Sequence, residues 1–305
     1  MTVLRKALPW TTVRETFFRL AASGYLPARL FVSSAPGRSS LFGRTGELSL
    51  EVVTHCWKYD HLLAYQLSSL ASFPPARGSV RATVFYAPED ERTAALLEWF
   101  GRLEVPRVQW NWQPLDRSLL MRRAIGRNMA ARATEADWIW FTDCDVIFHE
   151  GCLDGLFDQL QGCREPLVYP RQEHITPLLR DGHPLLAAAA GNPQLVHIDP
   201  AEFQTRACFV AKGPYQIAHG DVARALGYCE ALSVFHEPSD GWRKAHEDRA
   251  FRWLLRSQGF GIDIPAIYRI RHASKGRYQG SRAIGWIRGA IRRVGAGLAA
   301  QRVRA

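Results

Sequence analysis

Residues 122–145, RRAIGRNMAARATEADWIWFTDCD, join a helical stretch to a short apolar run and two aspartates. The apolar run Trp138–Thr142 is too short for a helix and is rich in β-forming residues, so it predicts a buried strand. Asp143 and Asp145 follow this strand directly. In extended backbone, residues i and i+2 point the same way, so we expect both carboxylates on one face while Cys144 points inward.

The segments around this stretch alternate between strand and helix signals. We expect strands at Leu48–Thr54, Val80–Tyr86 and Val105–Trp112, and helices at Thr11–Ser23, Tyr59–Ser72, Thr93–Arg102 and Leu119–Thr134. This alternation predicts an α/β fold with a mostly parallel sheet and helices on both faces. Ligands of such sheets bind beyond the carboxyl ends of the strands, which is where the aspartate pair lies.

The aspartate pair is a candidate metal site. Two carboxylates at a buried strand end repel each other, and a divalent cation relieves that repulsion. Mn²⁺ or Mg²⁺ is held by one or two carboxylates and completes its shell with water and substrate phosphates. A pair of solvated loop aspartates is the alternative that the tripeptide alone leaves open.

Charge is distributed unevenly along the 305 residues, whose composition is that of a globular protein. Residues 264–305 contain ten bases and no acid, and residues 1–46 contain seven bases and one acid, so the body between them is acidic. This pattern argues against nucleic acid as a partner and suits a body held beside an anionic surface by its ends. The six cysteines lack zinc-ligand spacing. Neither a secretory signal nor a membrane-spanning stretch is evident, which favours a cytoplasmic location.

Three segments, in this order, resemble the GT-A-fold glycosyltransferases, and most of all family 2. They are VVTHCWKYDHLLAYQLSSL at 52–70, the stretch 122–145, and AHEDRAFRWLLRSQGFGIDIPAIYRIRH at 245–272. The first is similar to the initial strand and helix of the family, the second to its ARN-x-A helix and DxD motif, and the third to the segment around its ED pair. The resemblance covers roughly three-quarters of the chain and implies a GT-A, Rossmann-like sheet.

The resemblance implies a nucleotide-diphosphate-sugar donor, with UDP-sugars favoured, and a Mn²⁺ or Mg²⁺ ion between the DxD motif and the diphosphate. Asp145 is then the main metal ligand, and Asp143 contacts the metal or the ribose. The resemblance also assigns Thr54 to a place beside the base, Arg122 and Arg127 to the base or diphosphate, and Asn128 to positioning. A solvated helix face is the alternative for the two arginines.

The second predicted strand departs from the family pattern. The family carries acidic residues at this strand end, whereas here the chain continues Tyr86-Ala87-Pro88-Glu89-Asp90. Glu89 or Asp90 is the candidate for the ribose, and Tyr86 is a candidate for stacking on the base. This departure leaves the identity of the nucleotide open.

The third segment supplies the predicted catalytic residues. By resemblance, Asp248 is the base that takes the acceptor proton, and Glu247 contacts the acceptor or orients the base. A single displacement by this base inverts the anomeric centre. His272, after the predicted strand Ile267–Arg271, is the third metal or diphosphate ligand. Capping of the predicted helix Asp248–Gln258 is the alternative for the acids, and a surface position is the alternative for the histidine.

These signals predict three regions. A basic arm covers 1–46, and a glycosyltransferase domain covers 47–275, with a nucleotide-sugar half at 47–150 and an acceptor half at 151–275. A basic amphipathic tail covers 276–305, in which residues 281–304 have apolar side chains at helical spacing opposite arginines. This tail predicts peripheral contact with an anionic membrane, and packing on the body is its alternative.

The leading hypothesis is a metal-dependent, inverting glycosyltransferase of polysaccharide biosynthesis, with a saccharide or lipid-linked acceptor. A sugar nucleotidyltransferase is the second hypothesis, although that class carries a glycine-rich loop after the first strand and this chain has His55-Cys56-Trp57-Lys58 there. A relative that binds a nucleotide or glycan without catalysis is the third.

Overall fold

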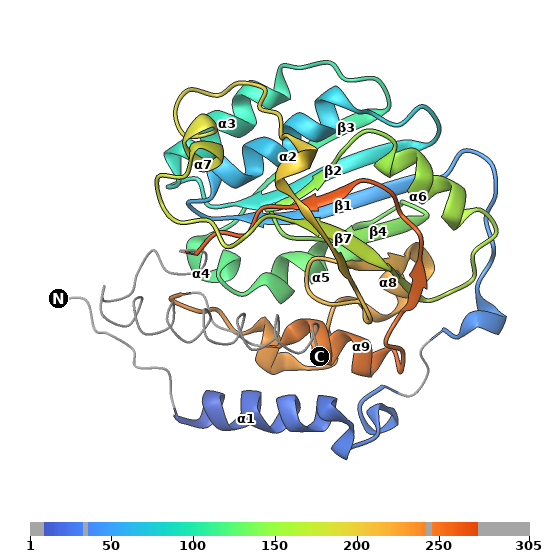
Figure 1. The fold of residues 1–305 in the computed structure, drawn as a ribbon. Helices are drawn as coiled ribbons and strands as arrows, with labels where there is room; N and C mark the ends of the chain where they lie inside the picture. The colour runs from blue at the N-terminus through green and yellow to red at the C-terminus, as the bar shows by residue number, and fades with distance from the viewer. Residues whose placement is uncertain (1–8, 33–35, 242–245, 274–305) are drawn as a thin grey trace, which may run out of the picture.

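Two β-sheets organise the chain in the computed structural model, which describes residues 9–32, 36–241 and 246–273 (Figure 1). The larger sheet has the strand order β10-β6-β9-β4-β1-β2-β3, and the smaller has the order β5-β11-β7-β8. The larger sheet contains β1 (Ser49–Cys56), β2 (Ser79–Tyr86), β3 (Val108–Pro114), β4 (Trp138–Phe141), β6 (Leu167–Pro170), β9 (Gln216–His219) and β10 (Phe260–Ile262). The smaller contains β5 (Val146–Phe148), β7 (Gln172–Ile175), β8 (Gln204–Ala207) and β11 (Ile267–Arg269).

The larger sheet is mostly parallel. β1 pairs in parallel with β2 and with β4, and β2 pairs in parallel with β3. β6 and β10 are also parallel to each other, whereas β9 runs antiparallel between β4 and β6. The first four strands therefore end at one edge of the sheet, and the predicted α/β fold class is confirmed.

Helices cover both faces of the larger sheet (Figure 1). Alternation along β1 sends Val52 into one core and Val53 into the other. The first face carries α2 (Asp60–Ser72), α3 (Glu91–Gly101), α6 (Cys152–Leu160) and the smaller sheet, and the second carries α5 (Arg123–Ala133), α8 (Gly220–Leu226) and α9 (Glu247–Leu254). The remaining α-helices of the described ranges are α1 (Pro9–Leu20), α4 (Arg117–Leu120) and α7 (Pro184–Ala188). No helix in these ranges has the length and apolar character needed to cross a bilayer.

Two local predictions are wrong. The predicted helix Leu119–Thr134 is divided, because Arg122 leaves helical backbone between α4 and α5. Its buried guanidinium donates to the Glu237 carbonyl at 3.1 Å and to Glu15 at 2.8 Å. The Asp143–Cys144–Asp145 segment is a turn rather than extended backbone, since the Val146 amide donates to the Asp143 carbonyl at 3.2 Å.

A buried amide holds this turn in place. The Gln66 side chain donates to the carbonyls of Asp143 and Val146, both at 3.0 Å, and accepts from the Thr54 hydroxyl at 2.7 Å. The turn lets the chain leave β4 in the larger sheet and enter β5 in the smaller. The aspartates therefore sit where the two sheets meet.

The described part of the N-terminal arm packs on the body. The predicted helix Thr11–Ser23 is α1 with a π-helical turn after it, Ala21–Tyr25. Arg249 donates to the Ser23 hydroxyl at 2.9 Å, and the Trp253 indole donates to the Leu26 carbonyl at 2.8 Å. The arm is thus attached to α9. The predicted tail, 276–305, lies outside the described residues.

Gly126 lets α5 approach the sheet closely. A Cβ at this position would lie 2.3 Å from His55 Nε2 and 3.0 Å from Phe85 Cγ, and both side chains are buried. We expect Gly126→Ala to lower the free energy of unfolding by about 1–3 kcal/mol, because neither ring has room to move. Urea denaturation measures the effect, with Gly37→Ala as the control because its Cβ would meet nothing within 4 Å. Equal stability of the two variants would contradict this packing.

Candidate active site at the carboxyl edge of the sheet

A cluster of charged side chains lies at the carboxyl ends of β1 and β4. Arg123 Nη1 lies 2.7 Å from Asp143 Oδ1, and Arg127 Nη2 lies 3.6 Å from the same oxygen. Arg127 is fully buried and also donates to the Thr142 carbonyl at 3.1 Å and the Gly213 carbonyl at 3.2 Å. The first two turns of α5 therefore point two guanidinium groups at the edge where a parallel sheet binds its ligands.

The predicted catalytic acids belong to the same cluster. Asp248 Oδ2 accepts from the Gly213 amide at 3.3 Å, so the loop residue that binds Arg127 also binds Asp248. Glu247 is 5% exposed, and its Oε2 has no hydrogen-bond partner among the described residues. Burial raises the pKa of Glu247, while Arg123 and Arg127 oppose that rise. The structure thus brings Asp143, Glu247 and Asp248 around two arginines.

A hydrogen-bonded chain connects the base candidate to the arginine pair. Arg127 donates to the Tyr228 hydroxyl at 2.8 Å, and that hydroxyl donates to Gln216 Oε1 at 2.7 Å. The Gln216 amide in turn donates to the Asp248 carbonyl at 3.0 Å. Burial raises the pKa of Tyr228, so this hydroxyl stays protonated at neutral pH. The chain fixes the start of α9 relative to α5.

His55 lies beside the two arginines of the cluster. It is 4% exposed, stacks on Phe85 with ring centroids 5.0 Å apart, and neither ring nitrogen has a hydrogen-bond partner among the described residues. Burial and the neighbouring Arg127 and Arg123 lower its pKa well below 6.5. The ring is therefore neutral and adds no positive charge to the cluster.

Asp145 faces a second charged cluster. It is 2% exposed and lies within electrostatic reach of Arg269 and Tyr215. Both of these bind the fully buried carboxylate of Glu173, Arg269 Nε at 2.8 Å and the Tyr215 hydroxyl at 2.5 Å. Lys212 Nζ binds the same carboxylate at 2.8 Å, and Arg206 also pairs with it. Because Asp143 faces α5 and Asp145 faces this Glu173 cluster, the prediction that they share one face is wrong.

The three predicted metal ligands do not form one set. Asp143 is paired with Arg123, and His272 Nε2 lies 2.7 Å from Asp181 Oδ1. Across the described ranges, no three His, Cys, Asp or Glu side chains gather as a metal site. The carboxylate oxygens of Asp143 and Asp145 are nevertheless the donor type that a hard cation prefers.

Three residues predicted to contact the donor form hydrogen bonds within the protein instead. Thr54 is bonded to Gln66, and Arg122 is bonded to Glu15 of the arm. Asn128 Oδ1 accepts from the Tyr228 amide at 2.8 Å, a contact within the protein that leaves its predicted role toward the donor a prediction. These side chains are thus engaged by the protein's own groups.

The three candidate residues at the end of β2 differ in their contacts and exposure. Asp90 caps α3, since it accepts from the Thr93 amide at 3.5 Å. It also accepts from the Thr93 hydroxyl at 2.7 Å and from the Lys58 amide at 2.5 Å. Tyr86 is half-buried and Glu89 is exposed. Of the three candidates at this strand end, Tyr86 and Glu89 therefore keep surface for a ligand.

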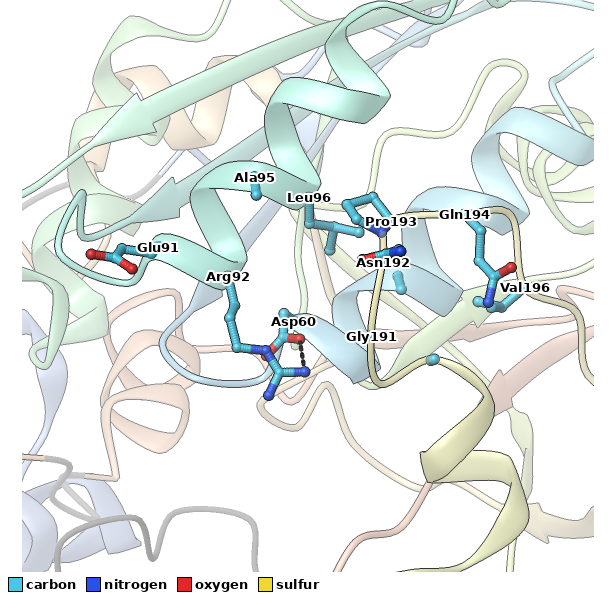
Figure 2. A pocket seen from close by; sticks show the side chains of 12 residues that line it. Asp60, Glu91, Arg92, Ala95, Leu96, Gly191, Asn192, Pro193, Gln194 and Val196 are labelled. Carbon is cyan, nitrogen blue, oxygen red and sulfur yellow. Dashed lines mark ion pairs between the residues drawn. The ribbon is translucent and has the colours of Figure 1, made fainter.

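Two cavities lie outside the charged cluster. Figure 2 shows one of about 220 Å³ between the first turns of α2 and α3 and the loop 191–194, where Arg92 pairs with Asp60 at 3.0 Å. The second, of about 520 Å³, is lined by residues 176–183 and Glu202. Neither is lined by the aspartates of the turn or by the acids of α9.

Sequence reasoning missed several members of the cluster. Arg123 and the buried His55 lie in segments that carry the resemblance, but Gly213, Gln216 and Tyr228 are single residues without a motif. Only the packing of their segments against α5 and α9 brings these three together. No local signal could have found them.

No family model and no curated protein matches the chain. Among solved structures it is similar to residues 1–349 of TarS from S. aureus, at 12% identity and a TM-score of 0.45, with 76% of this chain and 63% of that chain covered. It is also similar to the mannosyltransferase PcManGT from Pyrobaculum calidifontis, solved with GDP-Man and Mn²⁺, at 13% identity and a TM-score of 0.44, with 88% and 70% covered. The chain thus spans less than two thirds of the TarS chain. Because the identities and TM-scores are this low, the ligands of those two proteins are not transferred to this chain.

Proposed function

We propose that the protein is a glycosyltransferase that moves one sugar from a nucleotide-diphosphate donor to a saccharide or lipid-linked acceptor. The observation that carries this proposal is the buried cluster at the carboxyl edge, where Gly213 bonds both Arg127 and Asp248. It joins groups that bind an anionic leaving group to a carboxylate that can accept a proton. The sequence resemblance supports the same activity through the same segments.

Asp248 is the proposed base. Unlike Glu247, it is half-buried, so an acceptor hydroxyl can reach it. It takes the hydroxyl proton as the new C–O bond forms, and one such displacement inverts the anomeric centre. Glu247, 5% exposed among arginines, orients these groups.

Arg123, which is partly exposed, is proposed to bind the donor diphosphate, and the fully buried Arg127 to add positive charge behind it. Positive groups held in place before the reaction stabilise the charge that develops on the leaving diphosphate. Attraction to Asp143, Glu247 and Asp248 outweighs burial and raises the pKa of Arg123, so this side chain keeps its charge. In this arrangement the nucleobase and ribose of the donor lie near Tyr86 and Glu89. UDP is the favoured nucleotide.

Mn²⁺ or Mg²⁺ is the proposed cofactor, and Asp145 and Asp143 are the residues that would hold it. When bound, the ion supplies Lewis-acid neutralisation of the diphosphate. Asp143 would have to exchange its contact with Arg123 for a contact with the ion. Metal dependence therefore tests whether the turn at the end of β4 rearranges when the donor binds.

Thermal unfolding with UDP, GDP, dTDP and CMP, each with Mn²⁺ and again with EDTA, tests donor binding. One nucleotide is expected to stabilise the protein by about 2.7 kcal/mol at 100 times its Kd, and only with metal. Stabilisation that persists in EDTA would indicate that the arginines bind the diphosphate without a metal ion. The absence of any shift would contradict donor binding and favour a relative without catalysis, whereas release of pyrophosphate during turnover would indicate a sugar nucleotidyltransferase.

A further inference from the structure

The N-terminal arm presents an apolar surface to solvent. In α1, Val13, Phe17 and Leu20 lie four and three residues apart, so they share one side of the helix, where they are 55%, 47% and 50% exposed. Tyr25 and Leu30, in the next two turns of the chain, are 77% and 66% exposed. We call these five side chains the arm surface.

Exposed apolar side chains are concentrated on this arm. Ten large apolar residues are exposed across the described ranges, and six of them lie between residues 13 and 42. The other four are scattered over the body: Met129, Leu195, Phe209 and Phe260. A single exposed apolar side chain is ordinary, but a contiguous group on one helix marks a binding surface.

The same arm is cationic toward solvent. Arg19 and Arg29 are exposed, and neither forms an ion pair with a described residue. The only acid in residues 1–46 is Glu15, and its carboxylate turns inward to Arg122 at 2.8 Å. The arm therefore shows solvent apolar and cationic side chains without a carboxylate among them.

The inward side of α1 already has its partners. Arg14 pairs with Glu237 at 2.5 Å, and the Phe18 ring lies 5.5 Å from the Phe31 ring and 6.5 Å from the Phe235 ring. The arm surface is therefore not needed to attach the helix to the body. It stays available while α1 remains docked beside α9 (Figure 1).

We propose that the arm surface binds an anionic lipid membrane. Apolar side chains insert at the headgroup boundary, and neighbouring arginines attract anionic headgroups. A second copy of the chain would bring two cationic arms together. Residues 274–305 contain eight bases and no acid, so repulsion also disfavours that segment as the occupant. The proposal is independent of the proposed function, since it concerns residues outside the charged cluster.

Co-sedimentation of the full chain with vesicles tests the proposal. Phosphatidylcholine vesicles with and without phosphatidylserine are compared for the native protein and for a double variant, Phe17→Asp with Leu20→Asp. Binding to the anionic vesicles is expected to fall at least about ten-fold in the variant, because two apolar side chains no longer insert at the headgroup boundary. Phe209→Asp is the matched control, since Phe209 is 81% exposed but lies outside the arm.

A second variant tests the charge. Arg19→Glu with Arg29→Glu is expected to remove most of the preference for phosphatidylserine, because each arginine near the surface adds to the attraction. Equal binding to both vesicle types by the native protein would overturn the proposal, as would its failure to bind either. Binding that the arm variants leave unchanged would assign the membrane contact to another segment. Self-association that is lost in the Phe17 and Leu20 variant, without vesicle binding, would identify a second copy as the occupant.

Discussion

Asp248→Asn is expected to lower the rate of sugar transfer by about 10²–10⁴-fold while donor binding and the fold stay unchanged. Asparagine preserves the shape of the side chain and can still accept from the Gly213 amide, which lies 3.3 Å from Asp248 Oδ2. It cannot take a proton from the acceptor hydroxyl. Transfer rates, together with the nucleotide-induced shift in melting temperature, separate the loss of chemistry from a loss of binding.

The control for this variant is another aspartate. Asp263 is exposed and pairs with Arg171 at 2.6 Å on β10's flank, so Asp263→Asn should leave transfer unchanged. Near-normal turnover of Asp248→Asn would remove Asp248 from the mechanism. Glu247→Gln would then be the next variant to measure, because Glu247 is the other acid of the cluster.

Glu173→Gln is expected to lower the free energy of unfolding by roughly 3 kcal/mol, the largest stability effect that we expect for a single polar change. The fully buried carboxylate binds Arg269, Lys212 and Arg206 at once. An amide removes the negative charge and leaves these cations facing one another. Urea denaturation at neutral pH measures the loss, and a loss below about 1 kcal/mol would contradict the importance of this network.

The same residue predicts acid sensitivity. Burial alone would raise the pKa of Glu173, but Arg269 and Lys212 outweigh burial and hold it well below its ordinary value of 4.5. A lowered folded-state pKa adds stability above the unfolded-state value, and that stability is lost as the pH falls below about 4.5. The native protein should therefore lose more stability than Glu173→Gln between neutral and acid pH. Asp158→Asn, which removes an exposed pair with Arg77, should follow the native curve.

The regular part of the fold could be predicted from local sequence. The alternating signals placed β1, β2, β4 and α2 within two residues of their observed ends, because each element carries its own apolar pattern. The turn at Asp143 could not be predicted in this way. It depends on the Gln66 side chain, which lies 77 residues away in sequence.

The same limit applies to the site. Asp143 was found from the apolar strand that precedes it, and Arg127 and Asp248 were found by resemblance, but their contacts depend on distant residues. Arg122 illustrates the difference: its sequence context suggests a ligand contact, and the structure gives it Glu15, 107 residues earlier in the chain. Partners at such separations are set by packing, which no local pattern encodes.

The chain of hydrogen bonds from Arg127 to Asp248 has a consequence for biosynthesis. Arg127 leaves the ribosome before Gly213 and Tyr228, which are among its partners in the finished protein. A nascent chain that ends near residue 150 would hold this guanidinium without these partners, and β4 would lack its neighbour β9. The amino-terminal half therefore cannot complete its fold until the carboxyl-terminal half has been synthesised. We expect it to depend on chaperones until translation has passed α9.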